Sequence, residues 1–139
     1  MTDAEYDLPD KWCVQPSENS DEQNVEFHYK PGTGTRFIVR VVVEESDRRP
    51  YKLRLSTVTR TNVRHDYYVE AYDTRSEAIA AAELFTEYLT ANLRQGSLST
   101  SDPDIESVQD TIDAFVDDSS PDVLVQILRH IRSRYGLLS

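Results

Sequence analysis

The feature that most constrains the fold is a change of hydrophobic period at Thr74. Before this residue, apolar and polar residues alternate in four runs, 25–30, 35–45, 51–59 and 66–72, which are separated by short polar connections. A period of two is typical of half-buried strands, and short connections favour antiparallel neighbours. The sequence therefore predicts a four-stranded antiparallel meander. Its predicted core face carries Phe37, Val39, Val41, Leu53 and Leu55.

From Thr74 onward the pattern is helical. Thr74 and Glu77 fit a capping box, in which the Thr74 side chain accepts from the Glu77 amide and Glu77 reaches back to Thr74. Apolar residues then recur with helical spacing as far as Leu93, and Gly96 is a natural stop. A helix of this length can cover the whole core face of the sheet.

Two further helices are predicted after the polar linker 95–101. Asp102 with Pro103 marks the start of the first, and Ser120 with Pro121 marks the start of the second. The short link between them makes an antiparallel helical hairpin over 102–136. This hairpin can pack on the sheet, on a partner or on a second copy of the chain. Its surplus of apolar residues makes a homodimer through the hairpin one alternative.

The predicted fold class is α+β: a four-stranded antiparallel meander covered by one long helix, followed by a C-terminal helical hairpin. Residues 1–22 hold seven acids and one lysine, and we expect them to form a flexible acidic arm whose Trp12 docks on the fold. Residues 23–139 are expected to form a single α+β domain, with sheet plus long helix at 23–95 and the hairpin at 102–136. A chain of 139 residues can bury one substantial core.

The expected location is cytoplasmic. Cys13 is the single cysteine, so an internal disulfide is excluded. The first ten residues are acidic, unlike the basic start of a signal peptide. The apolar runs are far shorter than the roughly 20 residues that a membrane helix needs, so no membrane partner is expected.

The charge composition indicates a salt-rich environment. The net charge is −10, the pI is about 4.7, and the chain has three lysines among its 15 basic residues. In its acidity, its preference for arginine and its many Val, Thr and Ala residues, the chain resembles the proteins of halophilic archaea. A surface rich in carboxylates keeps its hydration and self-repulsion when molar salt would otherwise promote association.

No segment matches a cofactor or metal motif. The glycine segment Pro31–Thr35 lacks the Lys-Ser/Thr ending of a phosphate loop and leads into a strand, so a hairpin turn is the better interpretation. None of the three histidines has a second ligand at zinc spacing, and one cysteine is too few for a structural zinc site. The sequence therefore predicts neither a cofactor nor a metal; the three histidines are His28, His65 and His130.

Catalytic residues are not predicted either. Cys13 has no neighbouring histidine along the chain, and no Gly-x-Ser-x-Gly elbow is present. His65 and Asp66 could form a local dyad, but they lie at the junction of a loop and a strand, where a surface hydrogen bond is the simpler interpretation. We therefore expect a protein that is not an enzyme. A pocket with converging polar groups, lined by His65 or Cys13, would support the hypothesis of an enzyme instead.

The distribution of charge is uneven and indicates a binding face. Residues 30–65 hold nine Lys or Arg residues and three Asp or Glu residues, although the whole chain is strongly acidic. Strand parity places the cations of this segment on the outward side of the sheet, and two tyrosines of the fourth strand are expected beside them. The predicted partner-binding residues are Arg36, Arg40, Lys52, Arg54, Arg60, Tyr68 and Tyr72.

A structural role for these cations is an alternative. They can pair across strands with Glu26, Glu44 and Glu70. The acidic arm or the helical hairpin could also lie on the basic face and neutralise it, since residues 101–122 carry eight acids and no base.

One local resemblance bears on function. Three antiparallel strands followed by Tyr72-Asp73-Thr74-x-x-Glu77-Ala78-x-x-Ala81 resemble the end of the plant AP2 and integrase-arm DNA-binding domains. The likeness covers about 50 residues, and the Gly and Trp positions typical of those domains are missing here. It implies an arginine-bearing sheet that contacts DNA.

Two functional hypotheses follow from the sequence. The first is a non-enzymatic accessory protein of a halophile that recognises an anionic protein partner through the basic sheet face. The second is a DNA- or RNA-binding protein that uses the same face, with Tyr68 and Tyr72 contributing aromatic contacts.

Overall fold

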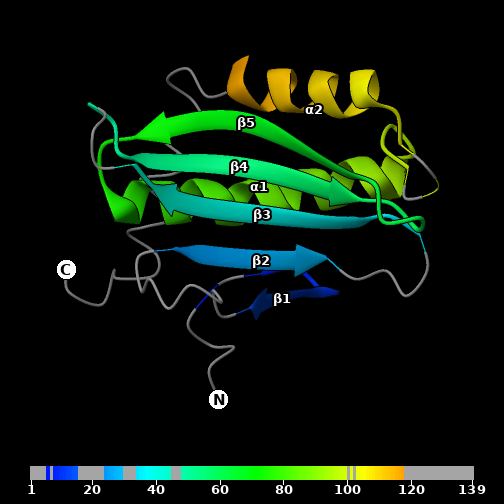
Figure 1. Cartoon of the computed structure of the whole chain (residues 1–139), viewed down its shortest axis with the longest axis horizontal. Helices are drawn as coiled ribbons and strands as arrows, with labels where there is room; N and C mark the ends of the chain where they lie inside the picture. Colours follow the sequence, from blue (N-terminus) through cyan, green and yellow to red (C-terminus); the bar gives the residue numbers. More distant parts are fainter. Residues whose placement is uncertain are drawn as a thin grey trace.

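The chain forms a five-stranded antiparallel sheet, with one long helix packed across one face and a second helix along the edge that the last strand forms (Figure 1). The computed structural model describes residues 6, 8–15, 24–29, 34–44, 48–99, 101 and 103–117. This arrangement confirms the α+β class and the antiparallel meander. The elements are β1 (Trp12–Gln15), β2 (Val25–Tyr29), β3 (Arg36–Val43), β4 (Tyr51–Val58), β5 (Arg64–Tyr72), α1 (Arg75–Gln95) and α2 (Ile105–Asp117).

Each strand pairs with the next one along the chain, so the spatial order is β1-β2-β3-β4-β5. The register places Phe27 opposite Val39, and Val39 opposite Leu55. All three side chains are completely buried. They form one row across the helix-covered face, as the alternation predicts. The strand residues that alternate with the core residues point to the other side of the sheet, which we call the outward face.

The helix α1 begins and ends where the sequence predicts. Thr74 is the N-cap and its hydroxyl accepts from the Glu77 amide at 3.2 Å, while the same hydroxyl donates to the Glu77 carboxylate at 3.0 Å. Gly96 ends the helix at a φ of 83°, in the left-handed region that glycine adopts without strain. Small residues such as Ala78, Ala81 and Ala82 are buried and let α1 approach β3, β4 and β5 closely.

The helix α2 packs beside α1 and over β5, as Figure 1 shows. Phe115 bridges the two helices, with ring centroids 4.8 Å from Phe85 and 5.5 Å from Tyr88. The predicted start at Pro103 is wrong by two residues, because Asp104 caps α2 by accepting from the Ser107 amide at 2.7 Å. The second helix of the predicted hairpin, and with it the homodimer alternative, lies outside the described residues.

The count of four strands is wrong, because the segment predicted to be an arm contains the edge strand β1. Trp12 pairs with Tyr29, and the two rings lie 5.3 Å apart. The docking of Trp12 is confirmed: the side chain is 7% exposed, and its indole Nε1 donates to the Thr90 hydroxyl at 2.9 Å. This bond ties β1 to α1.

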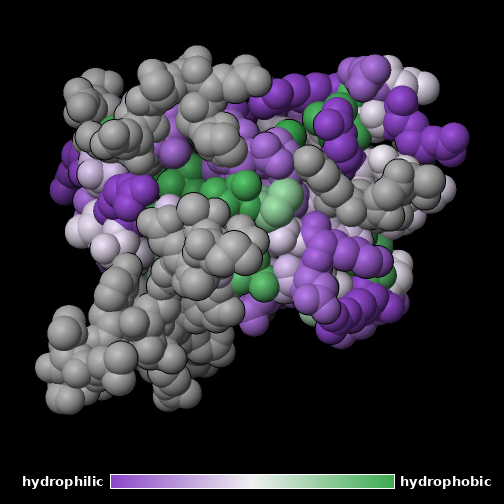
Figure 2. Space-filling model, turned by 90° about the horizontal axis from the view of Figure 1, so that it is seen from below, coloured by the Kyte–Doolittle hydropathy of each residue, from purple (hydrophilic) through white to green (hydrophobic). Residues whose placement is uncertain are grey.

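Hydrophobic side chains come to the surface in the middle of the view from the β1 side, with hydrophilic side chains around them (Figure 2). The core behind this edge is aromatic: Tyr6 contacts Phe27 edge-on, with centroids 5.2 Å apart, and Tyr29 contacts Phe37 at 6.1 Å. Among the described residues, no helix is long and apolar enough to cross a membrane.

Candidate partner-binding face

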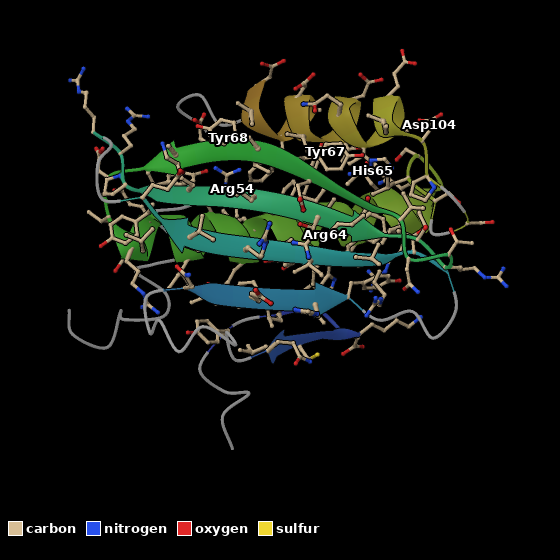
Figure 3. All side chains as sticks on the ribbon, in the orientation of Figure 1. Arg54, Arg64, His65, Tyr67, Tyr68 and Asp104 are labelled. Atoms are coloured by element: carbon tan, nitrogen blue, oxygen red, sulfur yellow. The ribbon has the colours of Figure 1, made fainter. Side chains whose placement is uncertain are left out.

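The outward face carries most of the cations that the sequence singles out. Strand parity and register place Arg36, Arg40, Lys52 and Arg54 on this side, and neither of the two described helices covers it. Figure 3 shows Arg54, Arg64 and Tyr68 on the side of the sheet that faces away from α1. Tyr68 is 49% exposed, so an incoming partner could contact its ring.

Two rows of side chains cross the outward face. In the first row, Glu26 lies opposite Arg40, Arg40 opposite Arg54, and Arg54 opposite Tyr68. In the second row, Ile38 lies opposite Ser56, and Ser56 opposite Asp66. Cross-strand neighbours of this kind stand close enough for their side chains to interact.

A hydrogen-bonded cluster joins the two rows at the centre of the face. Arg40 Nη2 donates to Ser56 Oγ at 3.1 Å and lies 3.6 Å from Asp66 Oδ1. Arg64 donates through Nε to Asp66 at 2.9 Å and through Nη2 to Ser56 at 3.3 Å. The Ser56 hydroxyl itself donates to Asp66. The completely buried Ser56 is therefore the common contact of two arginines and one carboxylate.

This cluster changes the acidity of its charged members. The hydrogen bond from Ser56, followed by that from Arg64, lowers the pKa of the Asp66 carboxyl below its usual value. Burial, followed by the charge of Arg64, lowers the pKa of the Arg40 guanidinium. The Arg40 Nε is buried and has no hydrogen-bond partner among the described residues. Arg40 is thus held in place as part of the sheet rather than extended into solvent.

Cross-strand pairing, the structural alternative, is present in part. Arg54 Nη2 lies 3.2 Å from Glu44 Oε2, which confirms one predicted pair. Arg40 pairs with Asp66, which was not predicted. Glu26 binds His28 at 3.0 Å, and the Glu70 carboxylate accepts from the Ala71 amide at 3.0 Å. The helix α2 packs along β5 and beside α1, and its Asp113 and Asp117 line a hollow together with Tyr68, so this acidic element borders the basic face at its β5 edge.

Tyr72 does not belong to the outward face. It is 8% exposed and lies opposite Tyr51, whose side chain packs against the core. The reason is a β-bulge: Leu53 pairs with Glu70 and Arg54 with Tyr68, so the extra residue in β5 reverses the parity after Tyr68. Burial, followed by the charge of Glu70, raises the pKa of the Tyr72 hydroxyl, which has no hydrogen-bond partner among the described residues.

Arg60 is also separated from the other predicted residues. It lies in the connection between β4 and β5 and is exposed. Three backbone and side-chain hydrogen bonds between Thr59, Asn62 and Val63 shape this turn. The four remaining basic residues and Tyr68 are brought together by the sheet. Arg64, Asp66 and Ser56 are the members of the face that the sequence prediction missed.

The structure alters two further expectations. His65 and Asp66 are not a dyad, because His65 lies opposite Thr57 on the helix-covered side, whereas Asp66 lies opposite Ser56 on the outward side. Cys13, in contrast, has a histidine neighbour: β1 places it directly opposite His28. Its thiol accepts from Gln15 Nε2 at 3.6 Å. Within the described part of the chain, no group of three potential metal ligands converges.

Comparisons with protein-family models, with curated proteins and with solved structures return no match to this chain.

Proposed function

We propose that the chain is a non-enzymatic accessory protein that binds an anionic protein partner through the outward face. The observation that carries this proposal is a cationic excess on the sheet face opposite α1, in a chain that is acidic as a whole. Five basic side chains lie there with three carboxylates, Glu26, Glu44 and Asp66; the basic residues are Arg36, Arg40, Lys52, Arg54 and Arg64. Complementary charge of this kind steers partners together and fixes their register.

The distribution of acids supports this assignment. Described carboxylates of α2 are exposed, for example those of Glu106, Asp110 and Asp113, and Asp113 lines a hollow with Tyr68 at the β5 edge of the outward face. The cationic excess of the outward face is therefore bounded along β5 by acids. An anionic partner is attracted to the centre of the face and repelled by α2, so the charge pattern favours one orientation. Adaptation to a salty cytoplasm belongs to the same proposal, and the acidic composition supports it.

A protein partner fits the outward face better than a nucleic acid does. Duplex DNA presents one negative charge per roughly 1.7 Å of its axis and no positive charge. The outward face mixes signs, since Glu26, Glu44 and Asp66 stand among the basic residues. Burial of Tyr72 also leaves Tyr68 as the one tyrosine of the predicted pair that is open to base stacking. A folded protein surface can match both signs.

The test is an NMR titration of the ¹⁵N-labelled chain with a soluble poly-glutamate peptide, at the lowest KCl concentration that keeps the chain folded. We expect saturable shifts at amides of β3, β4 and β5. The variant Arg36→Glu/Arg54→Glu should lose them. Arg40 is left unchanged because it is more buried and contacts both Ser56 and Asp66, so a carboxylate in its place would disturb folding. Arg54 and the carboxylate that it pairs with are more exposed to solvent than Arg40.

The matched control is Arg48→Glu/Arg94→Glu, which changes the net charge equally. Arg48 lies in the β3–β4 connection and Arg94 in the last turn of α1, and both are exposed. If this control weakens binding as much as the first variant, net charge is responsible and the proposal fails. A parallel titration with duplex DNA discriminates the second hypothesis: tighter binding of DNA at equal salt would favour a nucleic-acid partner.

A further inference from the structure

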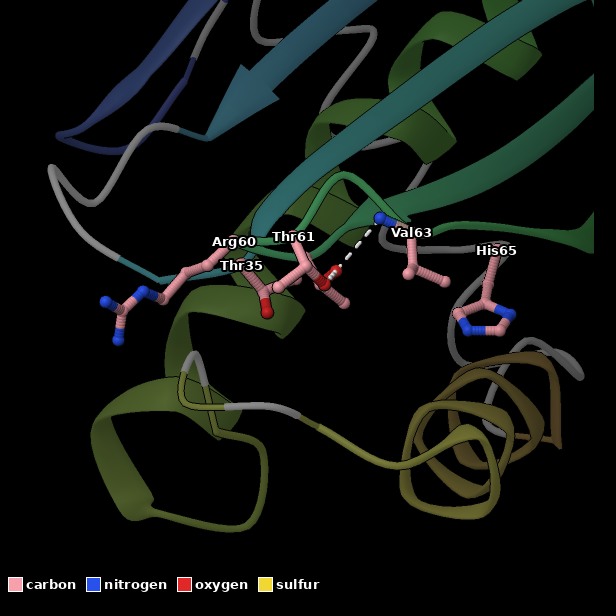
Figure 4. Close-up of a pocket in the computed structure, with 6 residues that line it drawn as sticks. Thr35, Arg60, Thr61, Val63 and His65 are labelled. Carbon is pink, nitrogen blue, oxygen red and sulfur yellow. Dashed lines mark hydrogen bonds between the residues drawn. The ribbon is translucent and has the colours of Figure 1, made fainter.

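A pocket of about 500 Å³ lies at one end of the sheet, apart from the outward face (Figure 4). The β4–β5 connection contributes most of its lining, together with the residue before β3 and the second residue of β5. Its volume falls within the range of roughly 300–1,000 Å³ that is usual for small-molecule sites. The lining residues are Thr35, Thr59, Arg60, Thr61, Val63 and His65.

Among the described residues that line this pocket there is no carboxylate, in a chain whose net charge is −10. Its polar groups are three hydroxyls, one guanidinium and one imidazole, all of which can donate hydrogen bonds. Strand alternation directs Asp66, the sequence neighbour of His65, to the outward face, while His65 points to the helix side. Val63 is 48% exposed and provides an apolar wall. Such a lining suits a ligand that carries negative charge and a small apolar body.

The threonine hydroxyls leave a donor for a ligand. Thr59 Oγ1 accepts from the Val63 amide at 3.0 Å and shares one hydrogen bond with Thr61 Oγ1 at 3.1 Å. Whichever of these two hydroxyls donates in the shared bond, the other keeps its own proton. One O–H group therefore stays available in either arrangement. The amide bond to Thr59 fixes this pair relative to the turn.

The basic groups lie at the two ends of the pocket. Figure 4 shows the side chains of Thr35, Thr61 and Val63 between Arg60 and His65, with the guanidinium of Arg60 directed away from them. Arg60 is exposed, and exposed side chains change rotamer within nanoseconds, so the guanidinium can turn toward a bound anion. Arginine stays protonated throughout the physiological pH range.

We propose that this pocket binds a small organic anion, an oxyanion group attached to a short apolar body. Arg60 provides the charge, the Thr59–Thr61 pair and His65 provide hydrogen bonds, and Val63 contacts the apolar body. The pocket includes His65, as the enzyme hypothesis requires, but its described lining includes no carboxylate to orient the imidazole. The proposal is therefore one of binding.

The test uses phenyl phosphate and benzoate as probes and benzyl alcohol as their neutral counterpart, with binding followed by amide shifts in ¹⁵N spectra. We expect both anions to shift the amides of 59–65 saturably and benzyl alcohol to shift them much less. Arg60→Ala should weaken binding of the anions by at least about threefold, as expected for loss of a charge-assisted hydrogen bond. Thr61→Val, which keeps the side-chain shape, should also weaken it.

The control is Arg48→Ala, which removes an exposed arginine at the opposite end of the strands and should leave the affinity unchanged. Three results would overturn the proposal: no shift at 59–65 with either anion, equal shifts with benzyl alcohol, or equal weakening by Arg48→Ala. Shifts confined to the outward face would overturn it as well. None of these variants lies on the outward face. A negative result at the pocket therefore does not test the proposed binding of a protein partner, and a negative result at the outward face does not test the pocket.

Discussion

The two faces of the sheet are formed by the same strands but are stabilised in different ways. On the helix-covered face, Phe37, Leu53 and Leu55 are completely buried among other apolar side chains. On the outward face, Ser56 is just as buried but is surrounded by Arg40, Arg64 and Asp66. One face is stabilised by removing apolar area from water, the other by satisfying polar groups.

This difference predicts how each face responds to substitution. Apolar burial is non-directional, so the helix-covered face should lose stability in proportion to the volume removed. Hydrogen-bonded ion pairs that are half exposed contribute little net stability, because water and salt compete for each charge. The exposed charges of the outward face, such as that of Arg36, can therefore change at small cost, whereas Arg40 belongs to the cluster around the buried Ser56.

The largest expected effect is in the core between the helices. Phe85 is completely buried and contacts Phe115 at 4.8 Å, so Phe85→Ala should lower the free energy of unfolding by about 3–5 kcal/mol. The matched outward-face variant is Tyr68→Ala, which should cost less than about 1 kcal/mol because half of Tyr68 is exposed. Urea unfolding at constant KCl measures both. Equal losses would remove the distinction between the faces.

A second prediction concerns the bond that joins β1 to α1. Thr90→Val keeps the side-chain shape and removes the acceptor of the Trp12 indole, leaving a buried donor unpaired. We expect a loss of about 1–3 kcal/mol. The variant Trp12→Phe tests the coupling: if the indole bond matters, adding Thr90→Val to Trp12→Phe should cost less than Thr90→Val alone. Additive losses would show that the bond contributes nothing.

How far the sequence predicts this fold depends on the range of the interactions. The strands β2 to β5 and the helix α1 follow from local periodicity and from the caps at Thr74 and Gly96. The strand β1 has four residues, too few for a periodic signal, and is defined by pairing with β2 and by the contact of Trp12 with α1. Contacts between segments that are distant in the sequence produce no local hydrophobic periodicity, so the sequence does not predict them.

The candidate site shows the same limit. Parity alone places Arg36, Arg40, Lys52 and Arg54 on the outward face. The bulge in β5, which moves Tyr72 to the core, has no sequence signature here, since neither glycine nor proline marks it. Adjacency in sequence suggests a contact between Asp66 and His65. Asp66 instead contacts Ser56 of β4 and Arg40 of β3 across the sheet.

A third prediction uses the side chain that the bulge moves inward. The Tyr72 hydroxyl is buried without a described partner, so its desolvation is uncompensated. Tyr72→Phe should therefore leave stability unchanged or raise it by up to about 1 kcal/mol, unlike the loss that follows removal of a bonded hydroxyl. Thermal and urea unfolding of the variant give the answer. A clear loss of stability would mean that the hydroxyl has a partner and that the bulge places the ring differently.

The smallest expected effect tests the outward face itself, through the pH dependence of Asp66. The hydrogen bonds from Ser56 and Arg64 lower the pKa of its carboxyl in the folded state. A group with a lowered folded pKa stabilises the fold above its unfolded pKa, about 3.9 for aspartate, and loses this contribution as pH falls through the folded value. Because the Asp66 side chain is 52% exposed, we expect less than about 1 kcal/mol.

The measurement is the difference in free energy of unfolding between the wild type and Asp66→Asn, followed from neutral pH down through the acid range. The difference should be largest near neutral pH and shrink below about pH 4, where the carboxylate becomes protonated. Ser56→Ala removes the leading cause of the lowered pKa, so in that background the difference at neutral pH should be smaller. A difference that does not change with pH would mean that the cluster at the centre of the outward face does not favour the charged carboxylate. The hydrogen bonds of Asp66 with Ser56 and Arg64 would then contribute nothing to stability that depends on its charge.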